Sequence, residues 1–215
     1  MSKKSSPQRV TKENIAELAH WLAARDPALA RILQQHGVPP LWQRPAGLAT
    51  MIRIVLEQQV SLSSAAATFS RLRNELGGPL TARRFLMLND QRLRELGFSR
   101  QKARYCRLLC EQVSTRQFSI SGLQRLSDQD ARQQITSLVG FGHWSADIYL
   151  LMALGRGDIL PTGDLALVLG IAEVTGRSFA DAEAVVDYAR LWQPYRSVAT
   201  RMIWLAYLAK RGKTL

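Results

Sequence analysis

The stretch LVGFGHWSA, residues 138–146, decides the fold of this 215-residue chain. Gly140 and Gly142 are separated by one apolar residue and predict a sharp turn between two crossing helices, because glycine adopts backbone conformations that other residues avoid. Such a turn lets the backbone approach a ligand closely and leaves the first N–H groups of the second helix pointing outward. Those N–H groups can bind phosphate, although an ordinary helix–turn–helix corner with a C-cap glycine would give the same pattern.

The sequence on both sides of this turn predicts helices, and no alternating strand pattern competes with them. Apolar residues recur at helical spacing over residues 46–55 and again over residues 65–72. Ser127 and Asp130 have the spacing of a capping box before a helix that we expect to end near Leu138. We expect further helix caps at Thr11, Asp26, Thr81, Asp90 and Ser99, and a second capping box formed by Ser178 and Asp181. The predicted fold class is therefore all-α.

The net charge points to a polyanionic partner. Lys and Arg together number 29 against 17 Asp and Glu, which gives a formal net charge of +12. Neutralising phosphates releases condensed counterions, so a surplus of this size favours nucleic acid as the partner. The first twelve residues are expected to form a basic flexible arm, 1–12, that carries Lys3, Lys4, Arg9 and Lys12.

The same sequence excludes several other classes of protein. No window reaches the roughly 18 uninterrupted apolar residues that a membrane span needs. We therefore expect no membrane partner and a cytoplasmic location, at the nucleoid of a bacterium or in the nucleus of a eukaryote. Cys106 and Cys110 share one helix face and are expected to be core residues, and no metal site is expected because the three histidines, His20, His36 and His143, are scattered.

Asp164 follows a Pro-Thr-Gly turn and precedes an apolar run, where an N-capping carboxylate belongs. By position alone the cap is the favoured interpretation. A carboxylate held at a helix start also stays ionised and rigid, so a cap and a chemical role can coexist.

Four motifs occur in an order that resembles the helix-hairpin-helix superfamily of DNA glycosylases. They are residues 138–146 with Trp144, the segment LPTGD at 160–164, the segment LEQQVS at 56–61 and the segment WQPYRS at 192–197. Within the superfamily, the chain is most similar to the alkylated-base branch, the 3-methyladenine DNA glycosylase II proteins. The resemblance covers about residues 25–210 and implies a compact form without the extra N-terminal domain of some members.

The resemblance implies a two-lobed helical bundle over residues 13–215, with an active-site cleft between the lobes. One lobe is expected to span about residues 51–160. The other combines residues 13–50 with residues 161–215.

The resemblance also implies an activity, the monofunctional hydrolysis of the N-glycosidic bond of alkylated purines such as 3-methyladenine and 7-methylguanine. The damaged base is flipped out of double-stranded DNA, and the reaction leaves an abasic site during base excision repair. Asp164 falls at the family's catalytic position, where a carboxylate stabilises the oxocarbenium-like sugar. A lyase variant of the superfamily carries a lysine where Trp144 stands, so no Schiff base and no lyase activity are expected.

Further roles follow from the resemblance alone. Trp144 and Trp192 match aromatic positions of the base pocket, and a core tryptophan is the alternative for each. Tyr149 lies one place beyond Ile148, which occupies the position of a pocket tyrosine. Gln58 and Gln59 match the loop whose side chain fills the gap left by the flipped base. The DNA backbone is expected to contact the hairpin, at Gly140, Gly142, His143 and Ser145. No cofactor is required, a monovalent cation at the hairpin is implied, and we expect a monomer.

Two residues near these motifs have competing interpretations. We expect Asp147 to make a structural hydrogen bond. Arg196 binds a backbone phosphate in one interpretation and is the partner of a carboxylate in the other.

Two alternative functions remain. One is a non-catalytic helix-hairpin-helix DNA-binding protein, which needs no carboxylate at Asp164 beyond capping. The other is a glycosylase for neutral lesions such as hypoxanthine or ethenoadenine, which would demand hydrogen bonding to the leaving purine.

Overall fold

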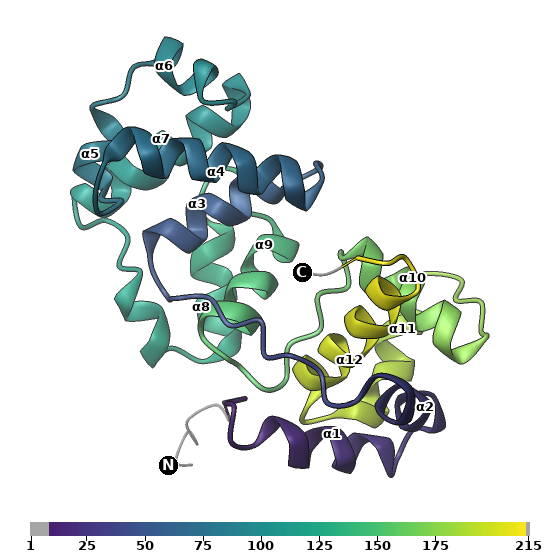
Figure 1. The fold of residues 1–215 in the computed structure, drawn as a ribbon. Helices are drawn as coiled ribbons and strands as arrows, with labels where there is room; N and C mark the ends of the chain where they lie inside the picture. The colour runs from purple at the N-terminus through teal and green to yellow at the C-terminus, as the bar shows by residue number, and fades with distance from the viewer. Residues whose placement is uncertain (1–8, 214–215) are drawn as a thin grey trace, which may run out of the picture. The chain divides into compact units, whose positions relative to one another are not determined.

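The computed structural model describes residues 9–213, and these form helices and no β-strand (Figure 1). A single antiparallel β-bridge joins Arg9 to Arg156 within this range. No helix in it is both long and apolar enough to cross a membrane. The all-α prediction is confirmed.

The chain divides into two compact units. The central unit runs from Arg44 to Tyr149, and the terminal unit combines Met1–Gln43 with Leu150–Leu215. The helices of the central unit are α3 Leu48–Glu57, α4 Leu62–Leu76, α5 Ala82–Leu86, α6 Asp90–Glu95, α7 Arg100–Ser114, the 3₁₀ helix η1 Ser121–Arg125, α8 Asp128–Thr136 and α9 His143–Ile148. Those of the terminal unit are α1 Ile15–Ala23, α2 Pro27–His36, α10 Leu165–Thr175, α11 Ala182–Tyr188, the 3₁₀ helix η3 Ala189–Trp192 and α12 Arg196–Ala209. A π-helical segment, η2 Tyr149–Ala153, continues α9 across the boundary.

The unit boundaries differ from the expected 50/51 and 160/161. Residues 44–50 belong to the central unit, where Arg44 forms an ion pair with Glu57 at 2.8 Å. Residues 150–160 belong to the terminal unit, because the backbone N–H of Ser197 on α12 donates to the carbonyl of Gly157. Both pairings join different elements of the chain, so the local sequence pattern does not reveal them.

The core of the central unit forms around α3, which packs against α4, α7 and α9. Met51, Ile52 and Val55 on α3 have no exposed surface. On α7, Cys106 and Cys110 are both buried, and burial raises the pKa of the Cys110 thiol to about 12. The two cysteines are core residues, as expected.

The core of the terminal unit forms around α12, which packs against α10, α2 and α1. Gly170 on α10 allows the closest approach, since a Cβ there would lie 2.5 Å from a methyl group of Ile203. Arg201 is buried inside this core, and its guanidinium donates to the carbonyls of Leu41, Leu151 and Ser197. Burial lowers the pKa of Arg201 to about 10.

Helix caps were predicted with partial success. Side-chain caps are confirmed at Asp26, Thr81, Ser99 and Ser127. Three other predicted caps are wrong. The N-cap residue of α1 is Asn14 rather than Thr11, and that of α6 is Asn89 rather than Asp90. The N-cap residue of α11 is Asp181, so Ser178 does not form the predicted capping box. Neighbouring polar residues compete for each helix start, so the choice depends on where the helix packs.

Residues 9–12 are the described part of the basic arm expected over residues 1–12. Lys3 and Lys4 lie outside the described residues. Val10 is 3% exposed, and its backbone N–H donates to the carbonyl of Gly155 at 2.7 Å. Residues 9–12 are therefore bonded to the terminal unit where they are described.

Candidate functional site

The glycine turn between α8 and α9 adopts the predicted hairpin. Gly140 has a φ of +88°, and a Cβ on it would lie 2.2 Å from the ring of Tyr105. Both the backbone conformation and the packed ring therefore require glycine at this position. Gly142 is the N-cap residue of α9, and a Cβ on it would meet no atom within 4 Å. Packing inside the protein does not explain this second glycine, and its open surroundings leave room for a ligand.

Gln58 holds the hairpin from α3. Its side-chain Nε2 donates to the carbonyl of Gly140 at 2.8 Å and to the hydroxyl of Ser145 at 3.0 Å. This engagement contradicts the expected wedge role of Gln58, because the side chain is committed to the turn. Gln59 is exposed and has a φ of +56°, so its wedge role stays a prediction.

The predicted DNA-contacting residues of the hairpin differ in exposure. Gly142 and His143 are exposed, and no side chain caps the N-terminus of α9. Ser145 is 2% exposed and its hydroxyl bonds to Gln58, so its side chain is a structural group and only its backbone can serve a ligand. Trp144, on the first turn of α9, is partly exposed, as a pocket wall must be.

Two other residues of α9 and η2 are structural. Asp147 accepts a hydrogen bond from Nε of Arg132 at 2.7 Å, which confirms the expected structural role. Tyr149 is 1% exposed, and its hydroxyl accepts the backbone N–H of Gly47. Burial raises the pKa of Tyr149 to about 12. A base cannot stack on this buried ring, so the pocket role expected for Tyr149 is not supported.

Asp164 caps α10. Its Oδ1 accepts the backbone N–H of Leu167 at 2.9 Å and the indole N–H of Trp204, from α12, at 3.1 Å. The backbone N–H of Asp164 closes the preceding turn by donating to the carbonyl of Pro161. The side chain remains partly exposed. The capping interpretation is confirmed, and the cap fixes the carboxylate in one orientation.

Two tryptophans near Asp164 were missed by the sequence analysis. Trp204 is 4% exposed and donates to the carboxylate, and Trp42 lies with its ring centroid 6.4 Å from that of Trp204. Trp42 is partly exposed and has a φ of +45°, which is rare for a bulky residue and is often kept at functional positions. Neither feature has a local sequence signal, because each depends on contacts between distant segments.

Trp192 is a core residue, which corrects its expected place at a pocket wall. It has no exposed surface, and its indole N–H donates to Oδ2 of Asp26 at 2.8 Å. The hydroxyl of Tyr188 donates to the same oxygen, and the two rings pack edge to face. Asp26 thus caps α2 with one oxygen and anchors Trp192 with the other.

Two charged side chains of the candidate site region, Arg196 and Lys102, have partners within the protein. Arg196 pairs with both oxygens of Asp158, at 2.7 and 2.9 Å, so its role as a carboxylate partner is confirmed. Lys102, the one lysine in the central unit, donates to the carbonyl of Leu56 at 2.7 Å. No group of three His, Cys, Asp or Glu residues within 9–213 could hold a metal ion.

Comparisons with known proteins agree with this geometry. The family model described as HhH-GPD superfamily base excision DNA repair protein matches residues 52–194. The Bacillus subtilis protein YfjP is 25% identical over 185 residues, which cover 82% of this chain but only 64% of YfjP. The chain thus spans less than two thirds of that relative's length.

Solved structures show the same fold. A DNA-3-methyladenine glycosidase from Bacillus halodurans superimposes with a TM-score of 0.79 at 25% identity, over 93% of both chains. The Schizosaccharomyces pombe 3-methyladenine DNA glycosylase Mag1, solved in complex with abasic DNA, gives a TM-score of 0.75 at 22% identity, over 87% of this chain and 95% of that chain. Because the matching family model spans more than half of the chain, from α3 through the hairpin and Asp164 to Pro194, the protein belongs to the HhH-GPD superfamily of base excision DNA repair proteins.

Proposed function

We propose that this protein is a DNA glycosylase that hydrolyses the N-glycosidic bond of alkylated purines in double-stranded DNA. The relatives named above include a DNA-3-methyladenine glycosidase and a 3-methyladenine DNA glycosylase, which supports this class of substrate. The reaction would release the base, leave an abasic site and so begin base excision repair. We expect the protein to act as a monomer in the compartment that holds the chromosome.

The observation that carries the proposal is the fixed carboxylate of Asp164. Breaking the N-glycosidic bond builds positive charge on the sugar, and a preorganised negative group stabilises that charge without reorganising in the transition state. Two N–H donors, from Leu167 and Trp204, hold one oxygen of Asp164 in place. The carboxylate therefore has the rigidity that this electrostatic role requires.

Partly exposed tryptophans supply the groups that would bind a flipped base. Trp144 begins the helix after the hairpin, and Trp42 packs against Trp204, the partner of Asp164. Each of these two residues has an accessible ring on which a base could stack. Tryptophan faces attract cations, and an alkylated purine that already carries positive charge leaves with little help from an acid. Both effects favour cationic lesions over neutral ones.

The hairpin would bind the DNA backbone through the N–H groups at the start of α9. The open space beside Gly142 lets a phosphate approach, and exposed His143 lies next to it. The turn also carries backbone carbonyls that suit a monovalent cation, because a carbonyl oxygen such as that of Gly140, which accepts one hydrogen bond, has a second lone pair. Such a cation would bridge protein and phosphate, and no catalytic step depends on it.

The arrangement of lysines supports hydrolysis without lyase activity. Trp144 stands where the lyase variant of the superfamily has its amine, and Lys102 of the central unit is bonded to a backbone carbonyl. In the terminal unit, Lys210 pairs with Glu173 at 3.2 Å. The expected product is an intact abasic strand, with no cleavage of the DNA backbone.

The test is base release from duplexes that each carry one defined lesion. We expect release of 3-methyladenine and 7-methylguanine by the wild type, slower release of hypoxanthine or ethenoadenine, and no strand cleavage until alkali is added. Faster release of the neutral purines would contradict the assignment of alkylated purines as substrates and favour neutral lesions. DNA binding without release of any base would favour the non-catalytic alternative.

A further inference from the structure

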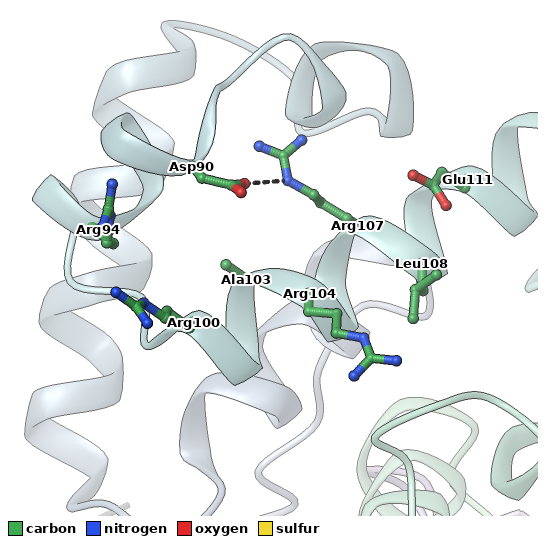
Figure 2. Close-up of a pocket in the computed structure, with 8 residues that line it drawn as sticks. All are labelled: Asp90, Arg94, Arg100, Ala103, Arg104, Arg107, Leu108 and Glu111. Atoms are coloured by element: carbon green, nitrogen blue, oxygen red, sulfur yellow. Dashed lines mark hydrogen bonds and ion pairs between the residues drawn. The ribbon is translucent and has the colours of Figure 1, made fainter.

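Helices α6 and α7 of the central unit line a surface cavity of about 580 Å³ that is rich in arginine (Figure 2). The lining residues of α6 are Asp90 and Arg94, and those of α7 are Arg100, Ala103, Arg104, Arg107, Leu108 and Glu111. Four arginines against two carboxylates leave a formal surplus of two positive charges. The cavity has the volume of an ordinary ligand pocket, and its rim carries four guanidinium groups.

The arginines of α7 share one face of the helix because they are spaced at i, i+4 and i+7. Arg100, Arg104 and Arg107 follow this spacing, whereas the buried face carries Cys106 and Cys110. Figure 2 shows Arg94 of α6 and Arg100 of α7 at the same end of the cavity. Two elements of the central unit thus bring their arginines to one surface.

Only one of the four guanidinium groups is neutralised. Arg107 donates to Asp90 at 2.8 Å and also to the carbonyl of Leu88. Arg94, Arg100 and Arg104 are exposed, and no hydrogen bond or ion pair holds their guanidinium groups within the described part of the chain.

The neighbouring arginine of α6 shows the contrast. Arg92 bonds to Glu75 at 2.5 and 2.9 Å and to Glu95 at 2.7 Å. Arg92 therefore has carboxylate partners on α4 and on α6, whereas Arg94, Arg100 and Arg104 have none within the described residues.

We propose that this cavity is a second site for the phosphodiester backbone of DNA, separate from the hairpin. Arginine presents a planar fork of donors that matches phosphate oxygens, and a phosphate would neutralise guanidinium groups that have no partner among residues 9–213. The inference rests on the proposed function, because it takes DNA as the ligand. It adds a second contact that would hold undamaged DNA while lesions are sought.

The helix geometry separates the two sites. Tyr105, whose ring packs on Gly140 of the hairpin, follows Arg104 directly on α7, so the two side chains diverge by about 100° around the helix axis. A phosphate bound at the hairpin cannot also fill the cavity. The phosphates at the cavity must come from the flank of the same duplex or from a second duplex.

The test compares two double variants of equal charge. Arg94→Gln with Arg104→Gln removes two guanidinium groups from the cavity and leaves the Arg107–Asp90 pair intact. Arg73→Gln with Arg83→Gln removes two exposed arginines of α4 and α5 that do not line the cavity. Affinity for undamaged duplexes of about one and about four helical turns, roughly 10 and 40 base pairs, is measured against salt concentration. Thermal unfolding checks that both variants fold.

We expect the cavity variant to reduce the salt slope of binding, log Kobs against log[salt], by up to about 1.8, since each phosphate contact contributes about 0.9. The control variant should change the slope much less. If the phosphates lie on the flank of one duplex, only the longer duplex shows the difference. If they belong to a second duplex, the wild type binds two short duplexes at low salt and the cavity variant binds one.

Equal slopes for the two variants on both duplexes would overturn the second site. The measurement uses undamaged DNA and needs no catalysis. Base release by the wild type from a short lesion duplex is recorded in parallel, so failure of the proposed activity is seen separately from failure of the second site.

Discussion

Trp204 donates its indole N–H to the same oxygen of Asp164 that accepts the backbone N–H of Leu167, across 3.1 and 2.9 Å. The two donors come from α12 and from the first turn of α10, so the carboxylate is fixed by two elements of the terminal unit at once. A helix cap alone needs only the bond to Leu167. The second donor gives Asp164 an orientation that capping does not require.

Replacing Trp204 should therefore slow base release without abolishing it. Trp204→Phe keeps an aromatic ring next to Trp42 but removes the N–H that orients Asp164. We expect up to about tenfold slower single-turnover release, because a net hydrogen bond contributes about 0.5–1.5 kcal/mol. The control is Trp21→Phe, which alters a tryptophan that packs on Tyr195 and does not contact Asp164 in this structure. Equal rates for the two variants would contradict the orienting role.

The two hairpin glycines should respond differently to alanine. Gly140→Ala places a Cβ against Tyr105 at a φ of +88°, so it should destabilise the protein by about 1–3 kcal/mol. Gly142→Ala meets open space and should leave thermal unfolding nearly unchanged, while weakening DNA binding because the methyl group occupies the approach to α9. Titration of an undamaged duplex measures the second effect. If Gly142→Ala bound the duplex with wild-type affinity, the hypothesis that the hairpin contacts DNA at Gly142 would be wrong.

Alanine substitutions at Gln58 and Gln59 should also have different effects. Gln58→Ala removes both hydrogen bonds to the hairpin and should cost about 1–3 kcal/mol of unfolding free energy, since the groups it leaves are partly buried. Gln59→Ala should leave stability unchanged, because the side chain is exposed. If Gln59 fills the gap left by the flipped base, this variant slows base release from a paired lesion more than from one in single-stranded DNA. Equal effects on both substrates would count against the wedge.

The corrected pocket predicts opposite behaviour for two tryptophans. Trp192→Phe loses the buried bond to Asp26 and should lower the melting temperature while leaving substrate KM unchanged. Trp42→Leu should raise KM for cationic lesions, since base–aromatic stacking contributes about 1–3 kcal/mol, with a smaller effect on melting. Steady-state kinetics and thermal unfolding of both variants distinguish the assignments. A raised KM for Trp192→Phe at unchanged stability would support the original assignment of Trp192 to the base pocket.

The features predicted correctly from the sequence are the local ones. The helices follow from apolar spacing, and the hairpin follows from two glycines one residue apart. Gly140 is an example, because glycine is the residue that most readily adopts a positive φ and its presence in the sequence therefore indicates the turn. Asp164 was recognisable as a cap for the same reason, since its Pro-Thr-Gly turn and the helix it begins are contiguous.

The features that were missed depend on contacts between distant segments. Whether a tryptophan is buried or partly exposed is set by its partner, and the partner of Trp192 is Asp26, 166 residues away in the sequence. The pairing of Trp204 with Asp164 spans 40 residues. The resemblance assigned Gln58 to the loop that fills the gap left by the flipped base, and only the folded hairpin shows the carbonyl and the hydroxyl that it bonds to.

The decisive prediction concerns the charge of Asp164. Asp164→Asn keeps the shape of the side chain and an oxygen that can accept the N–H groups of Leu167 and Trp204, so stability and DNA affinity should hardly change. It removes the negative charge that would face the developing oxocarbenium ion. Single-turnover base release should therefore fall by roughly 10²-fold or more, the scale seen when one preorganised partner of a transition state is lost.

Asp164→Ala separates capping from catalysis. It loses the cap as well as the charge and should cost about 1 kcal/mol of stability in addition to the defect in base release. If Asp164 served only as a cap, Asp164→Asn would be nearly silent in rate and Asp164→Ala would lose stability with no specific catalytic defect. Because the two hypotheses rank the variants differently in rate and agree on stability, measuring excision and thermal unfolding for both decides between them. An asparagine variant with wild-type excision would leave the non-catalytic DNA-binding protein as the better account.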